Sequence, residues 1–206
     1  MIIERLVEWR KTEDSIGVIN AHPPDLIVPI SYGTINPEHL ARGTEQTLRG
    51  GLWLMQRFPD AKMVFSSCSY LFKDAGFHED ALRWKMVKDA NLIHRVFRAR
   101  HMINSIDEAD AVSLAAERWE ITTKHILIVT CPMHSRRDQL IYGHRFPKSK
   151  IMISCMVGGE EFQPDHPVLM QRTAWQWFFV NETLLKAMQV LGPDALKRCH
   201  HWTSTK

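Results

Sequence analysis

The run His125–Thr130 (HILIVT) is a continuous apolar stretch rich in β-branched residues, and Cys131–Arg137 (CPMHSRR) follows it directly. A strand that is covered by helices on both faces has this kind of sequence, because neither of its sides meets water. The residues after it predict a helix at Met133–Phe146, which ends before Pro147. We therefore predict a buried central strand that leads directly into a helix.

On both sides of this strand along the chain, short apolar runs that predict strands alternate with longer amphipathic segments that predict helices. Such alternation predicts an α/β fold, namely a Rossmann-like three-layer sandwich with a mostly parallel sheet of about five strands. Pro29 lies in the first strand and has no N–H to donate, so we expect that strand to be irregular there. The predicted strands are 25–30, 62–66, a short basic one within 93–100, 125–130 and 150–155, and the predicted helices are 42–58, 76–91, 105–119, 133–146 and 169–191.

Composition excludes several protein classes. Of the 206 residues, 45% are hydrophobic and 24% are charged, which disfavours disordered, collagen-like and coiled-coil chains. The length suits one domain over 1–206, with 1–24 as an N-terminal extension and 169–191 as a C-terminal helix. The net charge of +3 comes without a basic run or an RNA-binding motif, so we expect no nucleic-acid partner.

Neither a membrane segment nor a metal site is indicated. No apolar stretch is long enough for a secretory signal or a membrane span, so we expect no membrane partner. The four cysteines are scattered without a CxxC pair, which favours buried thiols in a reducing cytoplasm. The eleven histidines form no HExxH motif and no compact cluster with aspartates.

Ligands of open parallel sheets bind beyond the carboxyl ends of the strands. The segments expected there contain Ser, Thr, Asn, His and Arg but few carboxylates, which favours an anionic ligand such as a phosphate or a carboxylate. These segments begin near Ser31–Thr34, Ser66–Ser69, Arg100–Ser105, Thr130–Arg137 and Val157–Gly159.

His134 and Arg137 form the densest group of candidate site residues. Their i, i+3 spacing places them on one face of a helix, near an N-terminus that offers backbone N–H groups and a positive dipole end. Arg137 can bind an oxyanion through two hydrogen bonds, and the nearby positive charge favours a neutral His134 that acts as a base. In the alternative interpretation, His134 caps the helix and Arg137 pairs with a surface carboxylate.

A helix start is indicated further upstream. The sequence Ser105-Ile-Asp-Glu108 has the spacing of a capping box, in which the Ser side chain and the Glu side chain each bind the other's backbone N–H. It predicts a helix that runs to about Trp119.

The segment Val129–Pro147 (VTCPMHSRRDQLIYGHRFP) resembles the VTxxxHxxRA signature of the ElyC/SanA/YdcF-like proteins, and Thr130, His134 and Arg137 match it. Asn104, Glu108 and Ala109 resemble that family's NTxENA segment. The correspondence spans roughly 25–185, and weaker matches occur in the family's order at Asp25, Arg42 and Glu79.

Three departures from the family pattern bear on the ligand. The first strand is followed by a turn with one glycine, Gly33, where relatives are Gly-rich. Ser66-Ser67-Cys68 replaces an SGG segment, and Asp138 replaces a small residue. Fewer glycines leave less room for a phosphate near the backbone, so a different substrate is expected.

The resemblance implies a Rossmann-like fold with a polar cleft. We expect an enzyme that transfers or hydrolyses a group on a small phosphorylated or otherwise anionic substrate. The alternatives are a protein that binds S-adenosylmethionine or a nucleotide, and a non-catalytic ligand sensor. The candidate catalytic residues are His134 and Glu108, and the candidate substrate-binding residues are Ser31, Tyr32, Arg42, Ser67, Asn104, Thr130 and Arg137.

Other residues have two interpretations each. The aromatic residues of the last helix form core or a homodimer face, and the alternative is a surface on which a ligand stacks: Trp175, Trp177, Phe178 and Phe179. Glu182 either reaches the cleft or pairs with an arginine. Glu45 and Glu79 are the carboxylates that best fit a position near the strand ends, although we expect both to be surface helix charges. The basic residues within 95–100 either form a basic rim or face solvent.

Overall fold

The computed structural model describes residues 5, 9–68, 75–155 and 174–196. Within them lies a five-stranded parallel sheet that confirms the predicted fold class. Its spatial order is β5 (Val96–Arg98), β4 (Lys62–Phe65), β1 (Leu26–Pro29), β6 (His125–Thr130) and β7 (Lys150–Cys155).

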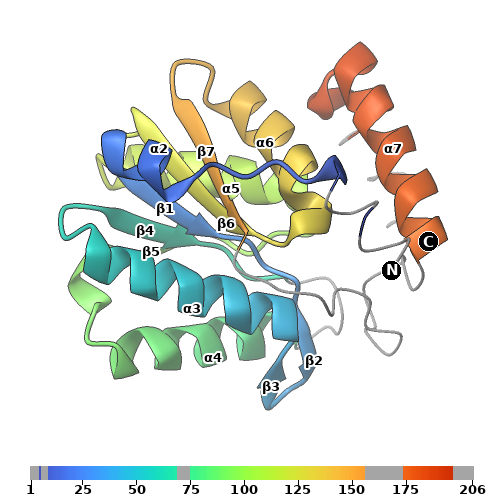
Figure 1. The fold of residues 1–206 in the computed structure, drawn as a ribbon. Helices are drawn as coiled ribbons and strands as arrows, with labels where there is room; N and C mark the ends of the chain where they lie inside the picture. The colour runs from blue at the N-terminus through green and yellow to red at the C-terminus, as the bar shows by residue number, and fades with distance from the viewer. Residues whose placement is uncertain (1–4, 6–8, 69–74, 156–173, 197–206) are drawn as a thin grey trace.

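Helices cover both faces of this sheet, which gives three layers (Figure 1). The first face packs against α3 and α4, and the short helix α2 joins that side. The opposite face packs against α5 and α6, with α7 beside α6. These helices are α2 (Ile16–Ala21), α3 (Arg42–Arg57), α4 (Ala75–Asp89), α5 (Ser105–Arg118), α6 (Pro132–Arg145) and α7 (Ala174–Leu191).

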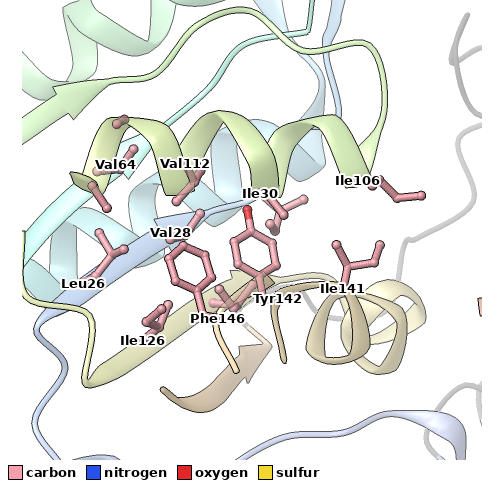
Figure 2. Packing of buried hydrophobic residues seen from close by; sticks show 14 of the residues in the cluster. Leu26, Val28, Ile30, Val64, Ile106, Val112, Ile126, Ile141, Tyr142 and Phe146 are labelled. Atoms are coloured by element: carbon pink, nitrogen blue, oxygen red, sulfur yellow. The ribbon is translucent and has the colours of Figure 1, made fainter. Parts of the chain in front are cut away.

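Alternation along β1 divides the core in two. Leu26, Val28 and Ile30 point toward α5 and α6, where Figure 2 shows them beside Tyr142 and Phe146. Ile27 points the other way and packs against residues of α3 and α4. Side chains of a strand alternate between the two faces of the sheet, so β1 contributes to both cores. Helices must then cover both faces, as the uniformly apolar sequence predicts.

The predicted cap of α5 needs correction. The capping box is wrong, because α5 is capped by Asn104, whose Oδ1 accepts from the N–H groups of Ile106 and Asp107 at 3.0 and 2.9 Å.

Two other predicted elements are present. The basic segment 93–100 contains the expected short strand, β5, after a 3-10 turn at Ile93–Arg95. The last helix ends as predicted at Gly192, whose positive φ of 78° lets its N–H reach the Met188 carbonyl at 2.9 Å. Residues 169–173 of that helix prediction lie outside the described residues.

The sequence interpretation missed two elements. One is α2, which Ser15 caps with its side chain. The other is the antiparallel hairpin of β2 (Thr34–Asn36) and β3 (His39–Leu40), which separates β1 from α3. A dinucleotide-binding phosphate loop requires the first strand to lead directly into a helix. In this chain the hairpin separates the two, so that requirement is not met.

Part of the predicted N-terminal extension protects an edge of the sheet. Asp14 donates its backbone N–H to Ile153 O at 2.9 Å, and its Oδ2 accepts from Ile153 N at 2.8 Å. Glu13 Oε1 accepts from Cys155 N at 3.0 Å. These bonds occupy backbone groups of β7 that would otherwise be open to another strand.

Cys68, Cys131 and Cys155 take part in no disulfide within the described residues, and of these three Cys131 is buried while the others are partly exposed; Cys199 lies outside the described residues. Every helix in the described ranges is too short or too polar to cross a lipid bilayer.

Candidate functional site

The candidate site lies at the carboxyl ends of β1, β4 and β6. The chain continues from β1 to β4 and β5 on one side of the sheet, and then crosses to β6 and β7 on the other. Ligands of such sheets bind where the strand order reverses, which here is next to β1. The side chains after these strands therefore define the site.

A proline and an arginine shape the floor of this region. Pro29 has no backbone N–H. Successive backbone groups of a strand point to opposite neighbours, and Ile30 N bonds to Val129 O of β6, so the missing N–H of Pro29 is on the side of β4. The pairing of β1 with β4 accordingly stops at Ile27. Arg83 of α4 fills the opening: its Nη2 donates to Pro29 O and its Nη1 to Ser66 O, both at 2.8 Å.

Two buried carboxyl groups meet at this floor. Glu79 accepts from Ser31 Oγ at 2.5 Å, from Cys68 N at 2.7 Å and from Arg83 Nη1 at 3.2 Å. Glu108 Oε1 accepts from Ser31 N at 3.1 Å and from Ser66 Oγ at 3.4 Å. Both side chains are about 1% exposed, so the expectation that Glu79 is a surface charge is wrong.

Burial sets the protonation of these acids. It raises the pKa of Glu108 to about 8, with Asp138 and Glu79 adding to the rise and Arg83 opposing it. Burial also raises the pKa of Glu79, and the charge of Arg83 is the largest effect against it. Glu108 is therefore protonated at neutral pH and can donate a proton.

A hydrogen-bond chain of fixed direction lies beside them. Thr130 Oγ1 donates to Asp138 Oδ2 at 2.5 Å, so it must accept from the Tyr32 hydroxyl, 2.9 Å away. The Tyr32 oxygen in turn accepts from Cys131 N at 3.0 Å. Burial raises the pKa of Asp138 to about 6, which Arg137 and the Thr130 bond oppose.

His134 is 3% exposed, and neither of its ring nitrogens has a hydrogen-bond partner within the described residues. Its ring lies against that of Tyr32, with centroids 5.3 Å apart. Burial, and then the charge of Arg137, lower its pKa well below 6.5, so the imidazole is neutral. A buried neutral imidazole has one donor and one acceptor, and leaving both unused costs free energy unless another molecule binds there.

Arg137 is partly buried and weakly held. Its Nη2 lies 3.5 Å from Ser105 Oγ, at the limit of a hydrogen bond, and its buried Nε has no partner among the described residues. Its charge favours ionisation of the buried Asp138. The alternative that Arg137 pairs with a surface carboxylate is therefore wrong for the described residues.

The start of α6 offers fewer open backbone N–H groups than expected. The first residue is Pro132, which has none. The N–H groups of His134 and Ser135 donate to Cys131 O at 3.0 and 3.1 Å, and Cys131 N donates to Tyr32. Side chains would therefore have to supply most of the hydrogen bonds to an anion at this helix end.

The other predicted site residues are only partly in this cluster. Ser67 is 1% exposed, and its Oγ has no partner in the part of the chain that the structure describes. Asn104 uses its side-chain oxygen to cap α5. Arg42 is exposed at the first position of α3. Ser69 and Val157–Gly159 lie outside the described residues.

Three buried groups of this cluster were not predicted as site residues: Arg83, Asp138 and Tyr142. The Tyr142 hydroxyl has no partner within the described ranges, and it lies near Glu108 and Asp138, which raise its pKa after burial does. Asp138 was visible in the sequence only as a departure from the family pattern. Arg83 gave no signal, because its i, i+4 spacing from Glu79 is also that of a surface ion pair.

Several open interpretations are settled as ordinary structure. Arg98 pairs with Asp80 at 2.8 Å and Arg100 with Asp107 at 2.5 Å, so these two do not form an unpaired basic rim. Glu182 pairs with Arg10. Glu45 pairs with Arg49 on the surface of α3, as expected. Trp175 and Phe179 are 61% and 63% exposed, so they are not core, and the Trp177 side chain lies outside the described part.

No family model, curated protein or solved structure matches this chain. The described residues also contain no group of three or more His, Cys, Asp or Glu side chains that could hold a metal ion. The case for a function therefore depends on the chemistry of the side chains at the ends of β1, β4 and β6.

Proposed function

We propose that the protein is an enzyme that transfers or hydrolyses a group on a small phosphorylated or otherwise anionic substrate. His134 acts as the general base, and Arg137 binds the anion. Glu108, protonated at neutral pH, is the acid of the cluster, and Ser67, Thr130 and Tyr32 line the site.

The observation that carries this proposal is the state of His134. It is neutral and buried, and both ring nitrogens lack a partner among the described residues. A general base must be unprotonated, and it must have a nitrogen that can bind the group whose proton it takes. A histidine buried for packing alone would leave the cost of two unsatisfied polar atoms unexplained.

The charges near His134 support an anionic substrate. The charge of Arg137 lowers the pKa of His134, and the buried Nε of this arginine has no partner among the described residues. In hydrolysis, His134 would take a proton from water as the new bond to phosphorus forms. Arg137 would hold the phosphoryl oxygens, and Glu108 would give a proton to the departing oxygen as its bond breaks.

The first experiment is a screen for phosphate release from nucleotides, sugar phosphates and prenyl pyrophosphates, with and without magnesium. His134→Gln should lower turnover by about 10²–10⁴ with little change in substrate binding. Arg137→Gln should weaken binding by roughly 10- to 150-fold. His94→Gln, a change of an exposed histidine in the 3-10 turn before β5, is the matched control and should retain full activity.

Release by the native protein and by His94→Gln, with loss in His134→Gln, would support the proposal. Calorimetry with S-adenosylmethionine and with nucleotides separates it from the alternatives. Tight binding of either ligand without any turnover would overturn the enzymatic proposal in favour of a binding protein. Equal activity of His134→Gln and the native protein would remove His134 from the mechanism.

A further inference from the structure

A cavity lies between α6 and α7, two helices that pack beside each other (Figure 1). Its volume is about 610 Å³, within the range of roughly 300–1,000 Å³ that small-molecule sites occupy. Arg136, Gln139 and Gly143 line one wall at i, i+3 and i+7 of α6. Leu185 and Met188 line the other wall, on the side of α7 that packs inward.

Charge is unevenly distributed along this groove. Arg136 is exposed at one end and has no partner among the described residues, and none of the described lining residues is acidic. Arg10 lies close enough to Arg136 for the two charges to repel, which lowers the pKa of Arg10 after burial does. Glu182 pairs with Arg10, and Arg136 has no identified carboxylate partner within the described ranges, so this end of the groove attracts an anion.

Three apolar side chains line the groove, beside the amide side chains of Gln139 and Gln189. Leu140 of α6 faces Leu185 and Met188 of α7, and these three side chains offer no hydrogen bonds. From Arg136 to His144, at the other end, α6 rises about 12 Å. An extended chain of about ten carbons has a similar length.

We infer that the groove between α6 and α7 binds an anionic amphiphile, whose charged head pairs with Arg136 and whose acyl chain of about ten carbons lies over Leu140, Leu185 and Met188. A cation at one end, an apolar floor and no acidic lining residue are the complement of a medium-chain carboxylate or acyl phosphate. The volume suits a small molecule better than a protein segment. This inference uses residues separate from His134 and Arg137, so it does not depend on the proposed enzymatic function.

The test is a titration of the full chain with decanoate below its micelle concentration, followed in ¹H–¹⁵N correlation spectra. Gly143 and Gly192 line the groove, and their amides should shift in a saturable way. The amide of Gly33, beside the other site, should not shift. Decanol and decyltrimethylammonium, which have the same chain without the negative charge, should bind at least tenfold more weakly.

Two variants with matched controls locate the ligand. Arg136→Gln should weaken decanoate binding about tenfold or more, whereas Lys148→Gln, an equal charge change in the exposed segment after α6, should not. No atom lies within 4 Å of a Cβ built on Gly143, so Gly143→Phe can fill the groove and should abolish binding. Gly143→Ala should preserve it. If Gly143→Phe fails to fold, the Arg136→Gln comparison decides.

Four results would overturn the inference. The first is the absence of shifts at Gly143 and Gly192 with decanoate. The second is equal binding of decanol. The third is an Arg136→Gln variant that binds decanoate like the native protein. The fourth is a groove that does not bind decanoate but binds an acidic amphipathic peptide, which would assign it to a protein partner.

Discussion

Arg83 Nη2 donates a hydrogen bond to the carbonyl oxygen of Pro29 at 2.8 Å, at the point where β1 can no longer pair with β4. The same guanidinium reaches Ser66 O after β4 and Glu79 in its own helix. One buried side chain thus joins two strand ends that the backbone leaves apart. The acidic cluster of the candidate site is assembled around it.

Arg83→Met should therefore destabilise the protein strongly. The change leaves Glu79 as a buried carboxyl without its ion-pair partner and leaves two carbonyls unsatisfied, a loss of about 3–5 kcal/mol. Arg83→Lys keeps the charge but lacks the planar fork, so it should lose part of that stability. Urea unfolding measures both. A stability of Arg83→Met within about 1 kcal/mol of the native value would contradict this account of the floor.

Glu108 should make stability fall as pH rises. Its pKa is raised from 4.5 to about 8, so the folded protein retains a proton that the unfolded chain loses above about pH 4.5. Stability from this group is complete below about pH 4.5 and declines until about pH 8. Asp138, with a pKa raised from 3.8 to about 6, acts with the same sign at lower pH.

Glu108→Gln mimics the protonated carboxyl and cannot ionise. Unfolding free energies measured between about pH 5 and pH 8.5 should decline less steeply in this variant than in the native protein. Parallel profiles would mean that Glu108 titrates in the folded protein as it does in the unfolded chain.

The partly buried Tyr32 and the buried Tyr142 should respond differently to loss of the hydroxyl. Tyr32→Phe removes the acceptor of Cys131 N and the donor to Thr130, so it should cost about 1–3 kcal/mol. Tyr142→Phe removes a hydroxyl without a partner among the described residues, so it should be nearly neutral or stabilising. Thermal unfolding compares the pair, and equal losses would argue against the chain through Tyr32.

Two glycines provide a similar comparison. A Cβ on Gly43 would lie 2.9 Å from the Tyr32 ring, so Gly43→Ala must displace that ring from His134 and should cost roughly 1–3 kcal/mol. Gly143 lies within α6 with open space beside it, so Gly143→Ala should stabilise the protein by up to about 1 kcal/mol. Unfolding midpoints measure both changes. A Gly43→Ala variant as stable as the native protein would show that Tyr32 is not closely packed there.

Much of the fold could be predicted from the sequence. The uniformly apolar run at His125–Thr130 and its weaker counterparts gave the strands, because burial on both faces excludes polar residues. The hairpin at Thr34–Leu40 escaped prediction because strands of two and three residues are too short to show a period. The cap of α5 was placed one residue late, since Asn104 and Ser105 are both good capping residues and the sequence does not choose between them.

The candidate site was predicted only in part. Thr130 and His134 are buried together at the end of β6, with Arg137 partly buried beside them. The burial of Arg83 as the partner of Glu79 could not be foreseen, because the same spacing on α3, at Glu45 and Arg49, gives an exposed pair. Arg83 is buried because it fills the gap between the ends of β1 and β4. That gap depends on strand pairing between residues that are distant in the sequence.

The central claim is that His134 is a neutral imidazole whose nitrogens are available to a substrate, and ¹H–¹⁵N long-range correlation spectra of its ring test this claim most directly. Between about pH 5 and pH 8 we expect a neutral ring that does not titrate, because burial and Arg137 lower its pKa. Adding a phosphorylated compound that the protein turns over should shift the ring nitrogens. A ring that titrates with a pKa near 6.5, or that ignores such a compound, would contradict the account.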